Sequence, residues 1–114
     1  MQSNLSVTPY KPSFGIKVAD NVINAAKKNY LDKQKVRLGQ FNRFLEKINV
    51  MKKYGFDNYT IMYGNEGKLH VFYACKDGEK SGIKHIKLIR ERYLQNAVTQ
   101  FLNLTKYDLL LKIK

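Results

Sequence analysis

The spacing of apolar residues changes at Gly55, and this change narrows the possible folds more than any other feature of the sequence. Before Gly55, apolar side chains recur every three or four residues, which is the spacing of an amphipathic helix. These positions are Leu38, Phe41, Leu45, Ile48 and Met51. After Gly55, apolar and polar residues alternate, which is the pattern of a half-buried strand. The chain is therefore predicted to be an α+β domain.

The part before Gly55 is predicted to contain one short strand and helical structure. The strand is indicated by the alternating residues Phe14, Ile16 and Val18. Asp20 is a favourable cap for a first helix that reaches Tyr30, and a second helix is predicted from Lys33 to Tyr54. Both prolines lie within residues 1–12, which are predicted to be a flexible lead-in to a single domain over residues 13–114.

The part after Gly55 is predicted to begin with a β-hairpin. Residues 59–63 and 69–75 alternate around the turn Gly64-Asn65-Glu66-Gly67. Apolar residues at helical spacing then predict one helix of roughly 20 residues from Ile86 to Leu104. Alternation from Tyr107 to Ile113 favours a final strand, although Leu110 breaks the alternation and a continuing helix also fits.

Read in order, these elements give β-α(α)-β-β-α-β, which is the split β-α-β or ferredoxin-like arrangement. It would form a four-stranded antiparallel sheet with helices on one face. The equally weighted alternative is an α+β domain with a two- or three-stranded sheet and a helical C-terminus. Either fold hosts many activities, so the fold alone does not indicate a function.

Positive charge is the clearest indication of a partner. Lysine and arginine outnumber aspartate and glutamate by 21 to 9, for a net charge of +12, and the excess gathers in residues 27–53 and 80–92. Acidic side chains would keep a small protein equally soluble, so the excess of basic residues favours a polyanionic partner. Nucleic acid bound mainly through its phosphates is the predicted partner. The candidate contacts are Lys33, Lys35, Arg37, Arg43, Lys47, Lys53, Lys80, Lys84, Lys87 and Arg90.

The two basic clusters predict two surfaces. The first is the solvent side of the helix before Gly55, where Lys35, Arg43, Lys47 and Lys53 are expected opposite the apolar stripe. The second is the start of the helix after the hairpin, where Gly78, Ser81, Gly82 and neighbouring lysines are predicted to form a phosphate seat.

Two other functions fit the same composition. One is a protein-interaction module, an inhibitor or adaptor that docks on an acidic surface. The other is a metal-independent endoribonuclease, with candidate residues Lys84, His85, Arg90, Arg92 and Tyr93. A non-enzymatic binding module is the first prediction. The sequence does not distinguish DNA from RNA as the ligand, and it indicates no oligomeric state.

Other sites and compartments have little support in the sequence. A single cysteine, Cys75, excludes an intramolecular disulfide and is predicted to be a packed thiol. The two histidines, His70 and His85, lack metal-ligand spacing, so neither a metal nor a cofactor is predicted. Signal-peptide and membrane-spanning patterns are absent, so a cytoplasmic protein without membrane contact is expected.

Phe72 and Tyr73 must point to opposite faces of their strand, so at most one of them is free to stack on bases.

Overall fold

The computed structural model describes residues 15–32, 36–77 and 85–113. The elements, in chain order, are β2 (Lys17–Val18), α1 (Asp20–Tyr30), α2 (Leu38–Met51), β3 (Tyr59–Glu66), β4 (Leu69–Lys76), β5 (Ile86–Glu91), α3 (Leu94–Leu102) and α4 (Lys106–Ile113). The predicted α+β class is confirmed. The predicted lead-in, residues 1–12, lies outside the described residues.

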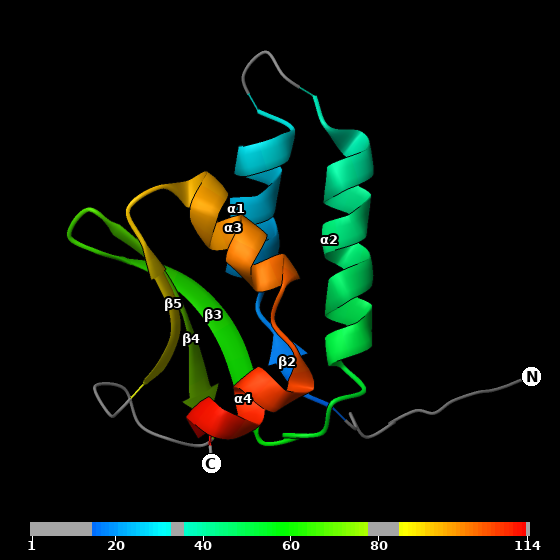
Figure 1. Ribbon diagram of the computed structural model, residues 1–114, viewed down its shortest axis with the longest axis vertical. Coiled ribbons are helices and arrows are strands. Elements are labelled where there is room, and N and C mark those ends of the chain that lie inside the picture. The colour runs from blue at the N-terminus through cyan, green and yellow to red at the C-terminus, as the bar shows by residue number, and fades with distance from the viewer. Residues whose placement is uncertain (1–14, 33–35, 78–84, 114) are drawn as a thin grey trace, which may run out of the picture.

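The sheet has four strands in the order β2-β3-β4-β5, and the helices lie on one side of it (Figure 1). β2 is parallel to β3, whereas the β3–β4 and β4–β5 pairs are antiparallel. Beyond the short β2, the Asn21 side chain continues the pairing, because its amide accepts from the Tyr63 N–H at 3.0 Å and donates to the Tyr63 carbonyl at 2.9 Å. The edge of β3 is thereby paired at Thr60, Ile61 and Tyr63.

Several predictions of local structure are wrong. Asp20 is the first residue of α1, and its side chain makes no capping bond. Gly64, Asn65 and Glu66 belong to β3 and not to the turn.

A further wrong prediction concerns β5. Residues 86–91 form a strand, so the helix starts only at Leu94. A register shift at Phe72/Tyr73 inserts a bulge into the β4–β5 pair, and both Leu88 and Ile89 are buried. A bulge can turn two successive side chains to one face, which breaks the alternation expected of a strand. The resulting apolar spacing resembles that of a helix.

At the C-terminus the favoured strand is wrong, and the alternative of a helix is confirmed, because residues 106–113 form α4. The Thr105 N–H donates to the Asp108 carboxylate at 2.9 Å, and the Asp108 N–H donates to the Thr105 hydroxyl oxygen at 3.1 Å. This reciprocal pair is a capping box that starts a helix. The ferredoxin-like order is therefore not confirmed, since β5 and α4 replace its last helix and strand.

The core joins the sheet to two layers of helix. Phe101 of α3 lies at its centre, with its ring centroid 4.7 Å from that of Phe44 in α2 and 5.2 Å from that of Phe72 in β4. All three rings are fully buried. α2 lies on the side of α1 and α3 away from the sheet (Figure 1), so this aromatic contact ties the outermost helix to the strands.

No helix within the described residues is both long and apolar enough to cross a membrane.

Candidate nucleic-acid interface

The predicted contact residues fall in three places. Lys33, Lys35, Lys80 and Lys84 lie outside the described residues, together with the predicted phosphate seat at residues 78–84. Arg37, Arg43, Lys47 and Lys53 belong to α2 and its ends. Lys87 and Arg90 are on β5. Within the described part of the chain, the cations of α2 and the cations of β5 do not line the same pocket.

The structure gives only part of the basic face that the sequence predicts on the solvent side of α2. The helix spans residues 38–51, so Arg37 is its N-cap and Lys53 follows its end. Arg37, Arg43 and Lys53 are exposed as predicted, and the other exposed residues of the helix include Asn42, Asn49 and the acidic Glu46. The exposed cations of this helix are therefore interspersed with neutral and acidic side chains.

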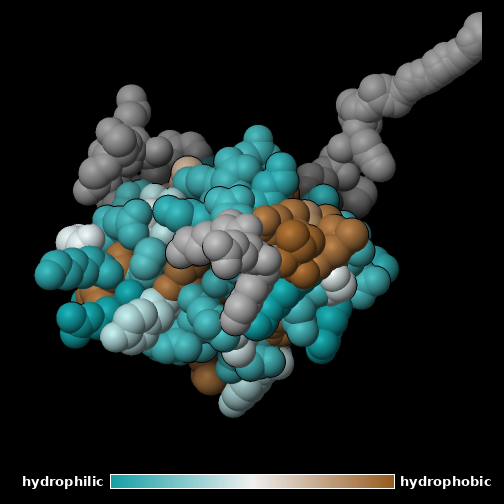
Figure 2. Space-filling view, turned by 90° about the horizontal axis from the view of Figure 1, so that it is seen from above, coloured by the Kyte–Doolittle hydropathy of each residue, from teal (hydrophilic) through white to brown (hydrophobic). Residues whose placement is uncertain are grey.

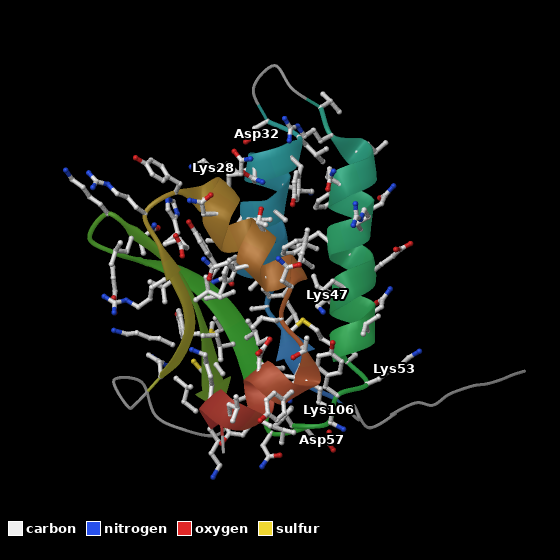
Figure 3. All side chains as sticks on the ribbon, viewed as in Figure 1. Lys28, Asp32, Lys47, Lys53, Asp57 and Lys106 are labelled. Carbon is white, nitrogen blue, oxygen red and sulfur yellow. The ribbon has the colours of Figure 1, made fainter. Side chains whose placement is uncertain are left out.

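Lys47 turns instead toward α3 (Figure 3), and it is half-buried. Its Nζ donates to the Tyr54 hydroxyl at 3.3 Å and lies 5.8 Å from the centroid of that ring. A groove of about 400 Å³ runs here between the two helices. Its lining residues are Arg43, Glu46, Lys47, Val50, Thr99, Leu102 and Asn103. The expected solvent-facing position is thus wrong for Lys47, because aromatic contacts hold it against the body of the protein.

Lys87 and Arg90 share one carboxylate on the outer face of the sheet. The Lys87 ammonium forms an ion pair with Glu66, and the Arg90 Nε lies 3.5 Å from the other oxygen of that carboxylate. The hydrogen bond from Lys87, aided by the charge of Arg90, lowers the pKa of Glu66. The two cations therefore lie on a strand beside an acidic partner, and not in the first turn of a helix as expected.

A hollow that the sequence does not predict lies between the end of α1, the start of β4 and the start of α3. Its volume is about 590 Å³. Its lining residues are Lys28, Asn29, His70, Tyr93, Leu94, Gln95 and Asn96. These residues come from three separated segments, and none of them is acidic. No run of neighbouring residues in the sequence indicates the hollow. A predicted helix start at Leu94 would have indicated only one of its walls.

The first turn of α3 supplies backbone donors to this hollow. The N–H groups of the first three helical residues have no acceptor within a helix. The N-cap residue Tyr93 makes no side-chain capping bond, and the first turn contains no acidic residue. The positive end of the helix dipole is also here. The start of α3 is therefore arranged to attract an anion.

His70 forms another wall of the hollow, where two polar side chains contact its ring. Its Nδ1 lies 2.6 Å from the Tyr63 hydroxyl and 3.4 Å from the Asn65 side-chain nitrogen. These contacts hold the imidazole ring in the wall of the hollow, beside the start of α3.

The charges around the hollow are mostly positive. Lys28 lies beside the start of α3 (Figure 3), with exposed Lys27 next to it in the last turn of α1. Exposed Arg92 precedes α3, whereas the Glu91 carboxylate accepts a hydrogen bond from Gln100. Asp32 ends the described part of this segment but does not line the hollow. The hollow thus has cations close by and no carboxylate in its wall.

The candidate residues for endoribonuclease chemistry are dispersed. His85 precedes β5, whereas Arg92 and Tyr93 follow its other end, and a strand of this length separates them by roughly 20 Å. Arg90 is paired with Glu66, and Lys84 lies outside the described residues. His85 is therefore remote from Arg92 and Tyr93 and is not placed to act with them on one phosphate.

The aromatic residues of the hairpin are divided between the two faces of the sheet. Tyr63 and Phe72 pack with the core, whereas Tyr73 is on the outer face. Tyr73 covers Gly64 and, with His85, lines a pocket of about 210 Å³. Burial raises the pKa of Tyr73. One half-buried ring is therefore present on this face, and not a row of exposed rings for stacking on bases.

No group of three or more His, Cys, Asp or Glu side chains suited to a metal ion occurs within the described residues. Comparison of the chain with protein-family models, with curated proteins and with solved structures finds no match.

Proposed function

We propose that this protein is a non-enzymatic module that binds nucleic acid mainly through phosphate groups, and that the hollow between α1, β4 and α3 is a principal contact. The observation that supports this proposal is the composition of the wall. It combines the Lys28 ammonium, the His70 ring and the uncapped N–H groups of α3, and it contains no carboxylate. Such a set of donors suits a phosphate diester, which carries negative charge and only accepts hydrogen bonds.

Tyr93 adds a second kind of contact at the same place. Its side chain is 63% exposed, and it lines the hollow together with the apolar residue Leu94. An exposed ring next to a phosphate site can stack on an unpaired base. The proposal therefore favours single-stranded nucleic acid over a duplex, whose bases are already stacked.

The surface around the hollow can extend the contact along a polymer. Lys27, Arg37 and Arg92 are exposed on the neighbouring elements. Arg43 and Lys47 line the separate groove between α2 and α3, which offers a second place for a phosphate. Each additional phosphate that is neutralised makes the affinity more dependent on salt.

A salt titration of binding to single- and double-stranded oligonucleotides tests the proposal. Affinity should fall steeply as salt rises, and Lys28→Ala should weaken binding and reduce the slope of log affinity against log salt by about one. Lys106→Ala is the matched control, because Lys106 is also exposed and lies at the opposite end of the molecule (Figure 3).

Two results would contradict the proposal. One is an absence of binding at low salt to every oligonucleotide tested. The other is an affinity for Lys28→Ala equal to that of Lys106→Ala, which would show that the hollow contributes nothing beyond net charge.

A protein partner is the second candidate, and exposed apolar side chains favour it. An apolar patch lies at the end of the molecule where α1 meets α2 (Figure 2), and Val36 and Leu38 are 69% and 56% exposed there. Leu111 of α4 is 65% exposed. A pull-down with and without nuclease separates the two candidates, since partners held by nucleic acid are lost on digestion and partners docked on these side chains are retained.

A further inference from the structure

Three soft donor atoms meet on the outer face of the sheet, at a place that the proposed nucleic-acid contact does not use. The Cys75 Sγ lies 2.9 Å from the His85 Nδ1 and 3.6 Å from the Met62 Sδ. Met62 is on β3, Cys75 is on β4, and His85 immediately precedes β5. Three segments of the chain thus place a thioether and an imidazole on either hand of the Cys75 thiol.

The position of these side chains is fixed by the sheet. Met62 and Cys75 lie on the same face, because Met62 pairs with Tyr73 and Cys75 pairs with Thr60 across the two strands. The Tyr73 ring packs against the His85 ring, with 4.7 Å between their centroids. This contact restricts the orientation of the imidazole, as neighbouring groups do around metal ligands.

The donor types select the ion. Thiolate and thioether sulfur prefer Cu(I), imidazole also binds copper, and the carboxylate and carbonyl oxygens that suit magnesium or calcium are not part of this cluster. One of the three donors is a methionine thioether, which is not among the usual ligands of zinc. A trigonal arrangement of two sulfurs and one nitrogen suits a monovalent soft ion.

We propose that Met62, Cys75 and His85 form a binding site for one Cu(I) ion. On binding, the thiol proton is released to solvent, a bond forms between the Cys75 sulfur and Cu(I), and lone pairs of the Met62 sulfur and His85 Nδ1 complete the coordination. No electron is transferred. Metal bonds to sulfur and to imidazole nitrogen are about 2.0–2.3 Å long, so a small rotation of the exposed His85 side chain opens the cluster around the ion.

The ion has a route to this site from solvent. His85 is exposed, whereas Met62 and Cys75 are half-buried beneath it. An ion can therefore enter past the imidazole and meet the two sulfurs without opening of the core. Exchange with a solution chelator should be fast enough for an equilibrium titration.

The test is an anaerobic titration of the full chain with Cu(I) in competition with the chromogenic chelator bathocuproine disulfonate. We expect one equivalent of Cu(I) to bind, and native mass spectrometry should show a complex with one copper per chain. Cys75→Ser should abolish this complex. Met62→Leu and His85→Gln should each weaken it at least about tenfold, because each removes one of three donors.

Matched controls distinguish the site from general changes. Met51→Leu makes the same chemical change at a methionine buried in the core, and His70→Gln makes it at the other histidine, on the opposite face of β4. Both should bind Cu(I) as the unchanged chain does. Amide NMR spectra of each variant confirm that the sheet is retained.

The proposal is wrong if no copper is retained against the chelator. It is also wrong if only Cys75→Ser loses copper while Met62→Leu and His85→Gln keep the original affinity, since the ion would then sit on an isolated thiol. Neither result depends on whether the protein binds nucleic acid.

Discussion

At the scale of single residues, Gly15 occupies a place that no other residue can fill. A Cβ atom built on Gly15 would lie 1.3 Å from the Lys52 carbonyl oxygen, which belongs to the backbone after α2. A backbone atom cannot rotate out of the way as a flexible side chain can. The close approach therefore requires glycine, and it joins the first described residue to the end of α2.

Substitution at two glycines should give effects of opposite sign. Gly15→Ala should lower the free energy of unfolding by roughly 1–3 kcal/mol or more, because the new methyl group forces the backbones apart. Gly39→Ala should raise it by about 0.5–1 kcal/mol, since Gly39 is in α2 with no atom within 4 Å of the new Cβ and alanine favours a helix. Urea denaturation of both variants measures the difference. Equal effects at the two positions would contradict the packing described for Gly15.

At the scale of elements, α4 depends on the ionised form of Asp108. Its pKa is lowered, chiefly by the hydrogen bond from the Thr105 backbone N–H and also by the Thr105 hydroxyl. A carboxylate whose pKa is lowered on folding stabilises the fold above its unfolded pKa of about 3.9. That contribution is lost as the pH falls through the lower folded pKa.

Acid should therefore loosen α4 before it unfolds the sheet. Below about pH 4, amide protons of residues 106–113 should exchange faster as the capping box is lost, while those of β3 and β4 remain protected. In Asp108→Asn, protection of α4 should be lower at neutral pH and should change less between pH 7 and pH 3. Hydrogen exchange followed by NMR measures both. An unchanged acid response in Asp108→Asn would assign the effect to another group.

The elements also show what the sequence pattern could predict. The hairpin was predictable because Gly67 allows the positive φ of 58° at its turn, and alternation on both sides of the turn is regular. The strand β5 was not, because the bulge at Leu88 and Ile89 removes the alternation on which a strand assignment depends. The start of α4 was readable in principle, since Thr105 and Asp108 have the spacing of a capping box.

At the scale of the whole molecule, the candidate interface could not be predicted from charge along the chain. Counting cations in residues 27–53 ignores the side of α2 on which each one lies, and the half-buried position of Lys47 depends on Tyr54 and α3. The hollow is assembled from Lys28, His70 and the start of α3, which are far apart in sequence. Only the tertiary fold brings them together.

The whole molecule should also depend on the central aromatic contact. Phe101→Ala should lower the free energy of unfolding by about 3–5 kcal/mol, because it leaves a cavity between α2, α3 and β4. Tyr107→Ala, at a residue that is 66% exposed on α4, should change it by less than about 0.5 kcal/mol. Chemical denaturation followed by circular dichroism makes the comparison. A small effect of Phe101→Ala would mean that α2 is not held through this ring.

The parallel pairing of β2 with β3 has a consequence for the order of folding. From β3 onward, each strand pairs with the next one in sequence, so these pairs form by closing short loops. Lys17, by contrast, pairs with Thr60, and the whole of α1 and α2 lies between them. Closing so long a loop costs more chain entropy than two strand residues return at once. We therefore expect β2 to join the sheet late, after α1 has already docked on β3. Pairing of this shortest strand is then the last step in forming the sheet.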